Sequence, residues 1–191
     1  MLQGDLVFQR RFLSQPDGRL DVDGRTWRML CDACAASTAP VAAPADWSGD
    51  SSQWPEEKKL ASLDPAFRPK VERVLEKLRA AGFQPQVIFG RRSVAVRRQL
   101  KASGHSKIDF SFHNAQKRDG TPNSYAVDIV DKRWGWTPDA ERNGFWAALE
   151  RLGKAEGCVW GGDWTSFPDV AHLQDKPNSQ LAMVRAASGV G

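Results

Sequence analysis

The spacing of apolar residues after position 57 predicts helices separated by short strands. The first helix begins at the Asp64-Pro65 cap, ends at Gly82 and carries apolar residues at helical spacing, namely Phe67, Val71, Val74, Leu75 and Leu78. Two more predicted helices cover residues 93–102 and 139–155. The predicted strands cover residues 84–89, 125–130 and 158–160. Because helices and strands mix without a regular βαβ alternation, the pattern favours an α+β fold with an antiparallel sheet.

This periodic pattern weakens toward both ends of the chain. Residues 35–56 are rich in Ala, Pro, Ser and Gly, a composition typical of a linker. Residues 1–34 contain two turn signals but too few apolar residues to bury a core of their own. We therefore expect a short N-terminal segment over 1–34, a linker over 35–56 and a main domain over 57–176. The remaining residues, 177–191, form either a loose tail or a short docking helix.

Positive charge is unevenly distributed along the 191 residues. The formal net charge is +4, with a pI near 9.1, yet residues 66–107 hold eleven Lys or Arg against two acids. This basic segment is either a solvated helix face or a surface that attracts an anionic polymer. No apolar stretch approaches the ~20 residues of a membrane helix, and the start of the chain has no apolar core of a signal peptide. We expect neither a membrane span nor a secretion signal.

Three cysteines are present, and their spacing does not predict a disulfide framework or a zinc site. Cys31 and Cys34 have the spacing of a redox or zinc pair, but no second cysteine pair completes such a site. Cys158 lies far away in the sequence. A mixed site completed by His105 or His113 would require a chance arrangement, so we expect no structural zinc at Cys31 and Cys34.

Two of the three histidines lie in informative surroundings. His113 lies in the sequence SFHN and His172 in DVAH, while Asp128 stands inside the predicted strand YAVDI. An acid inside an apolar strand is costly unless it is exposed, paired or bound to a metal. Two histidines and one carboxylate, with water in the fourth position, are typical of a catalytic zinc site. The alternative is that these three residues occur by chance and bind no metal.

Asp169 stands three residues before His172 and directly after Pro168. On an extended strand the two side chains would point to opposite faces, whereas a turn at Pro168 would bring both to one site. In that arrangement Asp169 is a candidate general base for the attacking water.

An ordered set of motifs runs through residues 63–174, namely QVIFGRRS, SFHN, YAVDI, WGGDW and FPDVAHLQ. This set resembles the zinc-dependent D-alanyl-D-alanine carboxypeptidases and L-alanyl-D-glutamate endopeptidases, the VanY-like peptidoglycan peptidases. The similarity is greatest to the endopeptidase branch found in phage endolysins. The resemblance implies a small antiparallel sheet with flanking helices around a zinc cleft, the hedgehog and DD-peptidase-like fold.

The resemblance also implies roles for individual residues. It identifies as zinc ligands the three residues of the set above, His113, Asp128 and His172. Asp169 matches the catalytic base, and Arg92 matches an arginine that holds the scissile carbonyl oxygen. Arg91 is the alternative if the turn is shifted by one residue. Ser111 matches a substrate-binding position, or else steadies its own loop by a local hydrogen bond.

One departure from the family concerns the spacing of two ligands. The family places the aspartate seven residues after the first histidine, whereas Asp128 follows His113 by fifteen. The extra eight residues are rich in Asn, Asp, Gly and Pro, so we expect a loop that leaves both ligands on their original elements. Such a loop would reshape the cleft more than the metal site.

Aromatic residues gather in sequence around the candidate ligands. Trp134, Trp136, Trp160 and Trp164 either fill the core or line a cleft that packs on glycan or peptide. Asp163 is either a turn residue or an acceptor that holds the tautomer of a ligand histidine.

The resemblance predicts a zinc metallopeptidase domain over 57–176, with the L-alanyl-D-glutamate bond of the peptidoglycan stem peptide as the expected target. The alternatives are a D-Ala-D-Ala carboxypeptidase or dipeptidase of the same fold, and a non-catalytic wall-binding protein.

The N-terminal pattern FQxxF…PDG…DG.TW..L resembles half of a small peptidoglycan-binding module. Together with the basic charge, this pattern favours an endolysin. Such a protein would stay in the host cytoplasm until release and would act in the periplasm or cell wall. We expect a monomer that binds peptidoglycan and anionic wall or outer-membrane polymers, and does not bind nucleic acid.

Overall fold

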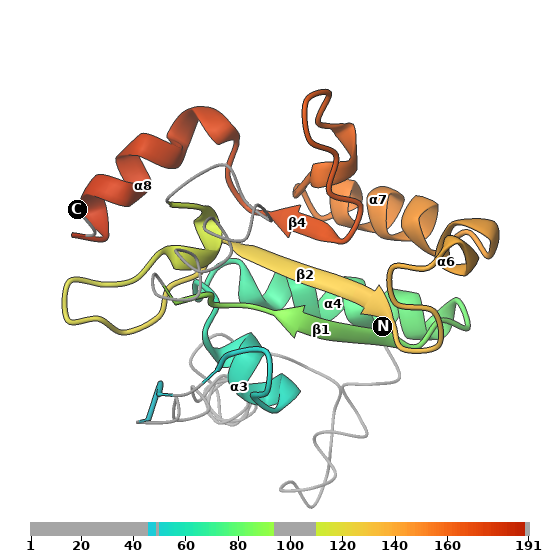
Figure 1. The fold of residues 1–191 in the computed structure, drawn as a ribbon, viewed down its shortest axis with the longest axis horizontal. Helices are drawn as coiled ribbons and strands as arrows, with labels where there is room; N and C mark the ends of the chain where they lie inside the picture. The colour runs from blue at the N-terminus through green and yellow to red at the C-terminus, as the bar shows by residue number, and fades with distance from the viewer. Residues whose placement is uncertain (1–45, 49, 94–109, 190–191) are drawn as a thin grey trace, which may run out of the picture. The chain divides into compact units, whose positions relative to one another are not determined.

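The computed structural model describes residues 46–48, 50–93 and 110–189. In this part of the chain the expected α+β architecture is confirmed, because four antiparallel strands form one sheet with helices packed on it (Figure 1). In sheet order the strands are β1 (Pro85–Phe89), β2 (Ala126–Asp131), β4 (His172–Gln174) and β3 (Val159–Trp160). The α-helices are α3 (Glu56–Ala61), α4 (Arg68–Ala80), α6 (Pro138–Arg142), α7 (Phe145–Ala155) and α8 (Leu181–Ala187). Single 3-10 turns are η1 (Phe112–Asn114), η2 (Gly161–Asp163) and η3 (Asn178–Gln180).

The main core lies between the sheet and the helices α4 and α7. In Figure 1, α4 lies behind β1 and β2, and α7 packs beside it. The sheet contributes Val127, Ile129 and Leu173, all fully buried. Because side chains alternate along a strand, Asp128 and His172 lie on the opposite face of the sheet from these residues. The core therefore fixes the two strands that carry the polar site.

The start of the first helix differs by a few residues from the sequence expectation. Asp64 does cap the turn, since its Oδ1 accepts from the backbone N–H of Ala66 at 3.0 Å. Regular helix begins only at Arg68, because Pro69 has no N–H to donate to the carbonyl of residue 65.

The expectation of one helix over 139–155 is wrong. The chain forms α6 and α7, which are separated by Gly144 in the left-handed conformation (φ +74°). The side chain of Asn143 donates to the carbonyl of Asp139 at 2.8 Å and so terminates α6. The apolar periodicity continues across the break, so the sequence pattern predicted one helix instead of two.

The C-terminal residues include a docking helix rather than a loose tail. Val184 of α8 is buried in a second apolar cluster with Phe110, Phe112 and Ala126. The predicted N-terminal segment, the linker up to residue 45 and the predicted helix beyond residue 93 lie outside the described residues.

The described part of the basic segment is largely paired with acids. Each lysine and arginine of α4 contacts a carboxylate at 2.6–3.0 Å, the pairs being Arg68–Glu72, Lys70–Asp175, Arg73–Glu156, Lys77–Glu156 and Arg79–Glu56. Most of these pairs are exposed, so each is worth only about 0.2–1 kcal/mol. Three of the four acids lie outside the segment in the sequence, so counting charge within the segment overstates its local positive potential.

No helix of the described residues has the length and apolar character needed to cross a bilayer. Cys158 is free and buried in the main core, and burial raises the pKa of its thiol to about 11. This thiol is therefore protonated at neutral pH. Cys31 and Cys34 lie outside the described residues.

Candidate metal centre

Strand register brings two of the predicted ligands together. Asp128 and His172 are direct partners across the antiparallel pair β2–β4. On the other side of β2, an irregularity between Val87 and Phe89 sets Phe89 opposite Asp128. The chain then leaves β1 toward Gly90 on the site side.

His113 comes from the short turn η1, which a capping box holds in place. The side chain of Asn114 accepts from the backbone N–H of Ser111 at 2.8 Å and donates to the carbonyl of Arg92 at 2.6 Å. The backbone N–H of Arg92 in turn donates to the carbonyl of His113 at 2.9 Å. The turn is thus tied to the segment after β1, and His113 is buried.

The extra residues between His113 and Asp128 form a small hairpin. Gln116 and Pro122 make an antiparallel bridge, and the N–H of Lys117 donates to the carbonyl of Thr121 at 2.8 Å. The tip is exposed, while both ends of the hairpin return to the buried site. His113 lies on η1 and Asp128 on β2, with this hairpin between them.

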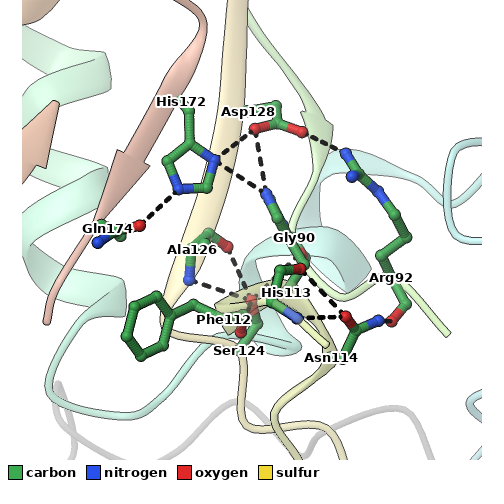
Figure 2. Close-up of polar contacts among 11 residues, drawn as sticks. Gly90, Arg92, Phe112, His113, Asn114, Ser124, Ala126, Asp128, His172 and Gln174 are labelled. Atoms are coloured by element: carbon green, nitrogen blue, oxygen red, sulfur yellow. Dashed lines mark hydrogen bonds and ion pairs between the residues drawn. The ribbon is translucent and has the colours of Figure 1, made fainter. Parts of the chain in front are cut away.

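The three predicted ligands meet at one point (Figure 2). His113 Nε2 lies 3.1 Å from Asp128 Oδ1 and 3.2 Å from His172 Nδ1, and the last two atoms lie 3.1 Å apart. Tetrahedral zinc with bonds of about 2.0–2.1 Å separates its ligand atoms by about 3.3 Å. The observed triangle therefore fits three corners of such a site. Among the described residues, these are the only cluster of His, Cys, Asp and Glu with this geometry.

Outer hydrogen bonds assign the tautomers of both histidines. Nδ1 of His113 lies 2.6 Å from the carbonyl of Gly90, which can only accept, so this nitrogen carries the proton. Nε2 of His172 lies 3.0 Å from Oε1 of Gln174. The amide of Gln174 has a fixed orientation, because its Nε2 donates to the carbonyl of Lys176 at 2.7 Å. Oε1 of Gln174 therefore accepts from His172.

These tautomers leave two nitrogen lone pairs facing a carboxylate oxygen. Three acceptors at 3.1–3.2 Å repel one another unless a cation lies among them. Neutral imidazole and carboxylate are the forms in which these groups ligate metals. The donor set thus fits a divalent metal with room for a fourth ligand.

The pKa values of the two histidines and of Asp128 are shifted from their usual ranges. Burial lowers the pKa of His113 to about 4, so this histidine is neutral at physiological pH. Burial also disfavours the charged form of His172, but its hydrogen bond to Asp128 and the charge of that residue raise its pKa overall. Burial opposes ionisation of Asp128 as well, yet the two histidines and Arg92 hold its pKa well below the usual range.

Asp169 and His172 lie on one tight turn beside the metal centre. The backbone N–H of His172 donates to the carbonyl of Asp169 at 3.2 Å, and the N–H of Asp169 donates to the carbonyl of Gly161 at 3.0 Å. Burial raises the pKa of Asp169, and the negative charge of Asp128 raises it further. A carboxyl with a raised pKa next to a metal suits general-base work.

Gly161 allows the close approach of this turn, and its replacement tests that packing. A Cβ on Gly161 would lie 2.6 Å from the carbonyl oxygen of Asp169 and 2.9 Å from Cβ of His172. We expect Gly161→Ala to displace the turn, to lower the free energy of unfolding by about 1–3 kcal/mol and to weaken metal binding. Gly82→Ala is the control, because it strains the backbone (φ +86°) where no atom lies near the new Cβ. Metal affinity that falls equally in both variants would contradict this packing role.

Arg92 lies against the candidate ligand Asp128. Its guanidinium contacts Asp128 Oδ2 at 2.6 Å and stacks over the ring of Phe89. Arg91 points elsewhere and donates to Oε1 of Gln116 at 3.1 Å. The hydroxyl of Ser111 contacts Asn114 Oδ1 at 3.1 Å. Substrate contact by Arg92 and Ser111 stays a prediction.

The tryptophans divide between packing and the site. Trp134 and Trp160 pack against the main core, and Trp136 is 57 % exposed. Trp164 lies with its ring 5.0 Å from that of His172, so it covers one side of the candidate centre. Asp163 is a half-exposed partner of Lys154 at 2.8 Å, and it holds neither histidine tautomer.

The tautomer-holding groups are Gly90 and Gln174, and sequence reasoning missed both of them. The signal for Gln174 was the strand alternation, since residues 172 and 174 share one face of β4. A backbone carbonyl such as that of Gly90 leaves no trace in residue type.

Comparison with protein families identifies part of the chain. Residues 122–175 match the peptidase M15 family described as D-alanyl-D-alanine carboxypeptidase. This part of the chain is therefore similar to the peptidase M15 family. The matched residues include Asp128, Asp169 and His172. His113 and Arg92 precede the matched range in the sequence, and the fold places His113 next to Asp128 and His172. M15 peptidases are metallopeptidases, in agreement with the donor set.

A curated protein similar to part of this chain is the peptidoglycan L-alanyl-D-glutamate endopeptidase CwlK of Bacillus subtilis (strain 168). The two are 36 % identical over 73 residues, which are 37 % of this chain and 36 % of CwlK. The chain thus spans about a third of the length of this relative.

Two solved structures are also similar. The L-Ala D-Glu endopeptidase ChiX of Serratia marcescens has 25 % identity and a TM-score of 0.47, over 62 % of this chain and 84 % of ChiX. VanYB in complex with D-alanine-D-alanine has 14 % identity and a TM-score of 0.43, over 65 % of this chain and 77 % of VanYB.

Proposed function

We propose that this protein is a zinc-dependent peptidoglycan peptidase that hydrolyses the L-alanyl-D-glutamate bond of the stem peptide. The observation that carries the proposal is the triangle of His113, Asp128 and His172, whose facing acceptors call for a cation. Three protein ligands and one open position are typical of catalytic rather than structural zinc. The name of the relative CwlK supports the choice of bond.

The residues around the triangle have separable roles in this proposal. Bound zinc would supply Lewis acidity and lower the pKa of the attacking water. Asp169 takes the proton from that water and passes it to the leaving amine. Arg92 lies next to the ligand Asp128, where its guanidinium is available to hold the developing oxyanion of the scissile carbonyl. Ser111 binds substrate near the first histidine.

A second candidate is a D-Ala-D-Ala carboxypeptidase or dipeptidase, which the similarity of residues 122–175 to a D-alanyl-D-alanine carboxypeptidase family favours. Both candidates use the same ligands and base, and they differ in the pocket that receives the peptide terminus. A wall-binding protein without catalysis is a weaker candidate, because binding alone does not require an acid such as Asp169 beside the candidate ligands.

Digestion of labelled peptidoglycan, with and without a chelator, separates these functions. We expect the zinc-loaded protein to release products whose new N-terminus is D-Glu, as read by mass spectrometry. Chelation should stop release, and added zinc should restore it. Released D-Ala would instead identify a carboxypeptidase, and no product under any condition would contradict peptidase activity.

We further propose that the protein acts as an endolysin on the periplasmic side or in the wall, as a monomer. The support is the basic composition and the wall-binding pattern at the start of the chain. Because α4 pairs its charges with acids, attraction to anionic wall or outer-membrane polymers depends more on the remaining basic residues up to Lys107.

A further inference from the structure

Gln174 is a buried polar side chain that the proposed chemistry does not use. It lies on the same face of β4 as His172, whereas Leu173 between them points into the main core. Across the ladder its partner is Ala126, whose small side chain leaves space for an amide. Gln174 is 1 % exposed, so all of its polar atoms need partners inside the protein.

Every polar atom of this amide has a partner. Nε2 donates to the carbonyl of Lys176 at 2.7 Å and to Oδ1 of Asn178 at 2.9 Å. Oε1 faces Nε2 of His172 at 3.0 Å (Figure 2). A flipped amide would point Oε1 at two oxygens and its NH₂ group at the ring N–H of His172. The orientation of Gln174 is therefore fixed by the chain that follows β4.

We propose that Gln174 is the positioning residue that holds His172 in the form and orientation needed for metal ligation, and that it acts through Oε1. The inference rests on the metal centre of the proposed function. Accepting the Nε2 proton of His172 leaves the Nδ1 lone pair at the triangle and makes the imidazole a stronger ligand. His113 receives the same support from the carbonyl of Gly90, which side-chain substitution does not remove.

The first test is zinc affinity. Gln174→Met keeps the length of the side chain and removes the acceptor. We expect its dissociation constant for zinc, measured by competition with a chromophoric chelator, to rise about 10–100-fold, the usual cost of losing such an outer partner. Asn178→Ala is the matched control, because it removes one contact of Gln174 and leaves both Oε1 and the bond to the Lys176 carbonyl.

The second test is spectroscopic and does not depend on activity. In the NMR spectrum of the zinc-loaded wild type, we expect two slowly exchanging ring N–H protons, from Nδ1 of His113 and Nε2 of His172. Gln174→Met should lose the His172 signal to exchange with water and keep the His113 signal as an internal standard. Asn178→Ala keeps Oε1 of Gln174 and the bond to the Lys176 carbonyl, so it should retain both protons and the zinc affinity.

The outcomes separate this inference from the function on which it rests. A wild type that binds no zinc would overturn the metal centre itself. A different result would overturn the role of Gln174 alone: the wild type binds zinc, and Gln174→Met has the same zinc affinity and keeps both ring N–H signals. Equal losses in Gln174→Met and Asn178→Ala would also overturn it, because the effect would then come from packing rather than from Oε1.

Discussion

His172→Ala is expected to abolish stoichiometric zinc binding and, with it, peptidoglycan hydrolysis. The substitution removes one of three donor atoms that lie 3.1–3.2 Å apart and leaves His113 Nε2 and Asp128 Oδ1 without their common partner. Losing a direct ligand should weaken zinc binding by more than the about 10–100-fold that an outer partner costs. Elemental analysis of the zinc-loaded protein measures the loss directly.

The matched control is His105→Ala, which removes the histidine outside the predicted ligand set. It should keep one zinc per chain and normal hydrolysis. Thermal unfolding gives a second readout, because a ligand present at 100 times its dissociation constant stabilises the folded state by about 2.7 kcal/mol. Zinc should therefore raise the Tm of the wild type and of His105→Ala, but not of His172→Ala. Equal zinc content in the two variants would remove His172 from the metal centre.

Most of the fold was predictable because the burial pattern is regular. The apolar positions of α4 and the run around Asp128 have the periods of a helix and a buried strand, and the structure buries both sets. The break at Gly144 was not predicted, since the residues on either side continue one apolar stripe. The left-handed backbone conformation of Gly144 separates the two helices, and the apolar pattern of the side chains does not reveal it.

The candidate ligands were predictable for a different reason. Asp128 is an acid in a strand with every residue buried, and such an anomaly calls for a partner. The supporting groups were not predictable, because their roles come from the register of β2 against β4 and from one backbone carbonyl. The pairing of Arg92 with Asp128 likewise depends on how η1 binds the segment after β1.

A backbone turn determines where Asp169 lies relative to His172. The turn was expected at Pro168, whereas the structure closes it between Asp169 and His172. Gly161 makes room for that turn from the opposite side. The candidate base and one candidate ligand are thus held by the same few backbone contacts.

Asp169→Asn is expected to keep zinc and lose most hydrolysis. The amide has nearly the same shape as the carboxyl, so the turn that carries His172 should survive, and zinc content should equal that of the wild type. An amide does not accept the proton of the attacking water, and loss of a general base typically lowers the rate about 10²–10⁴-fold. The measurement is kcat on a soluble stem peptide, together with zinc content.

Asp163→Asn is the matched control for this substitution, because it makes the same chemical change nearby in the chain. Asp163 is half-exposed and pairs with Lys154, so its neutralisation removes a surface ion pair worth less than about 1 kcal/mol. We expect this variant to keep both zinc and hydrolysis. An Asp169→Asn enzyme that retains more than half of the wild-type kcat would exclude Asp169 as the base. One that loses zinc as well would show that the carboxylate supports the metal centre rather than the proton transfer.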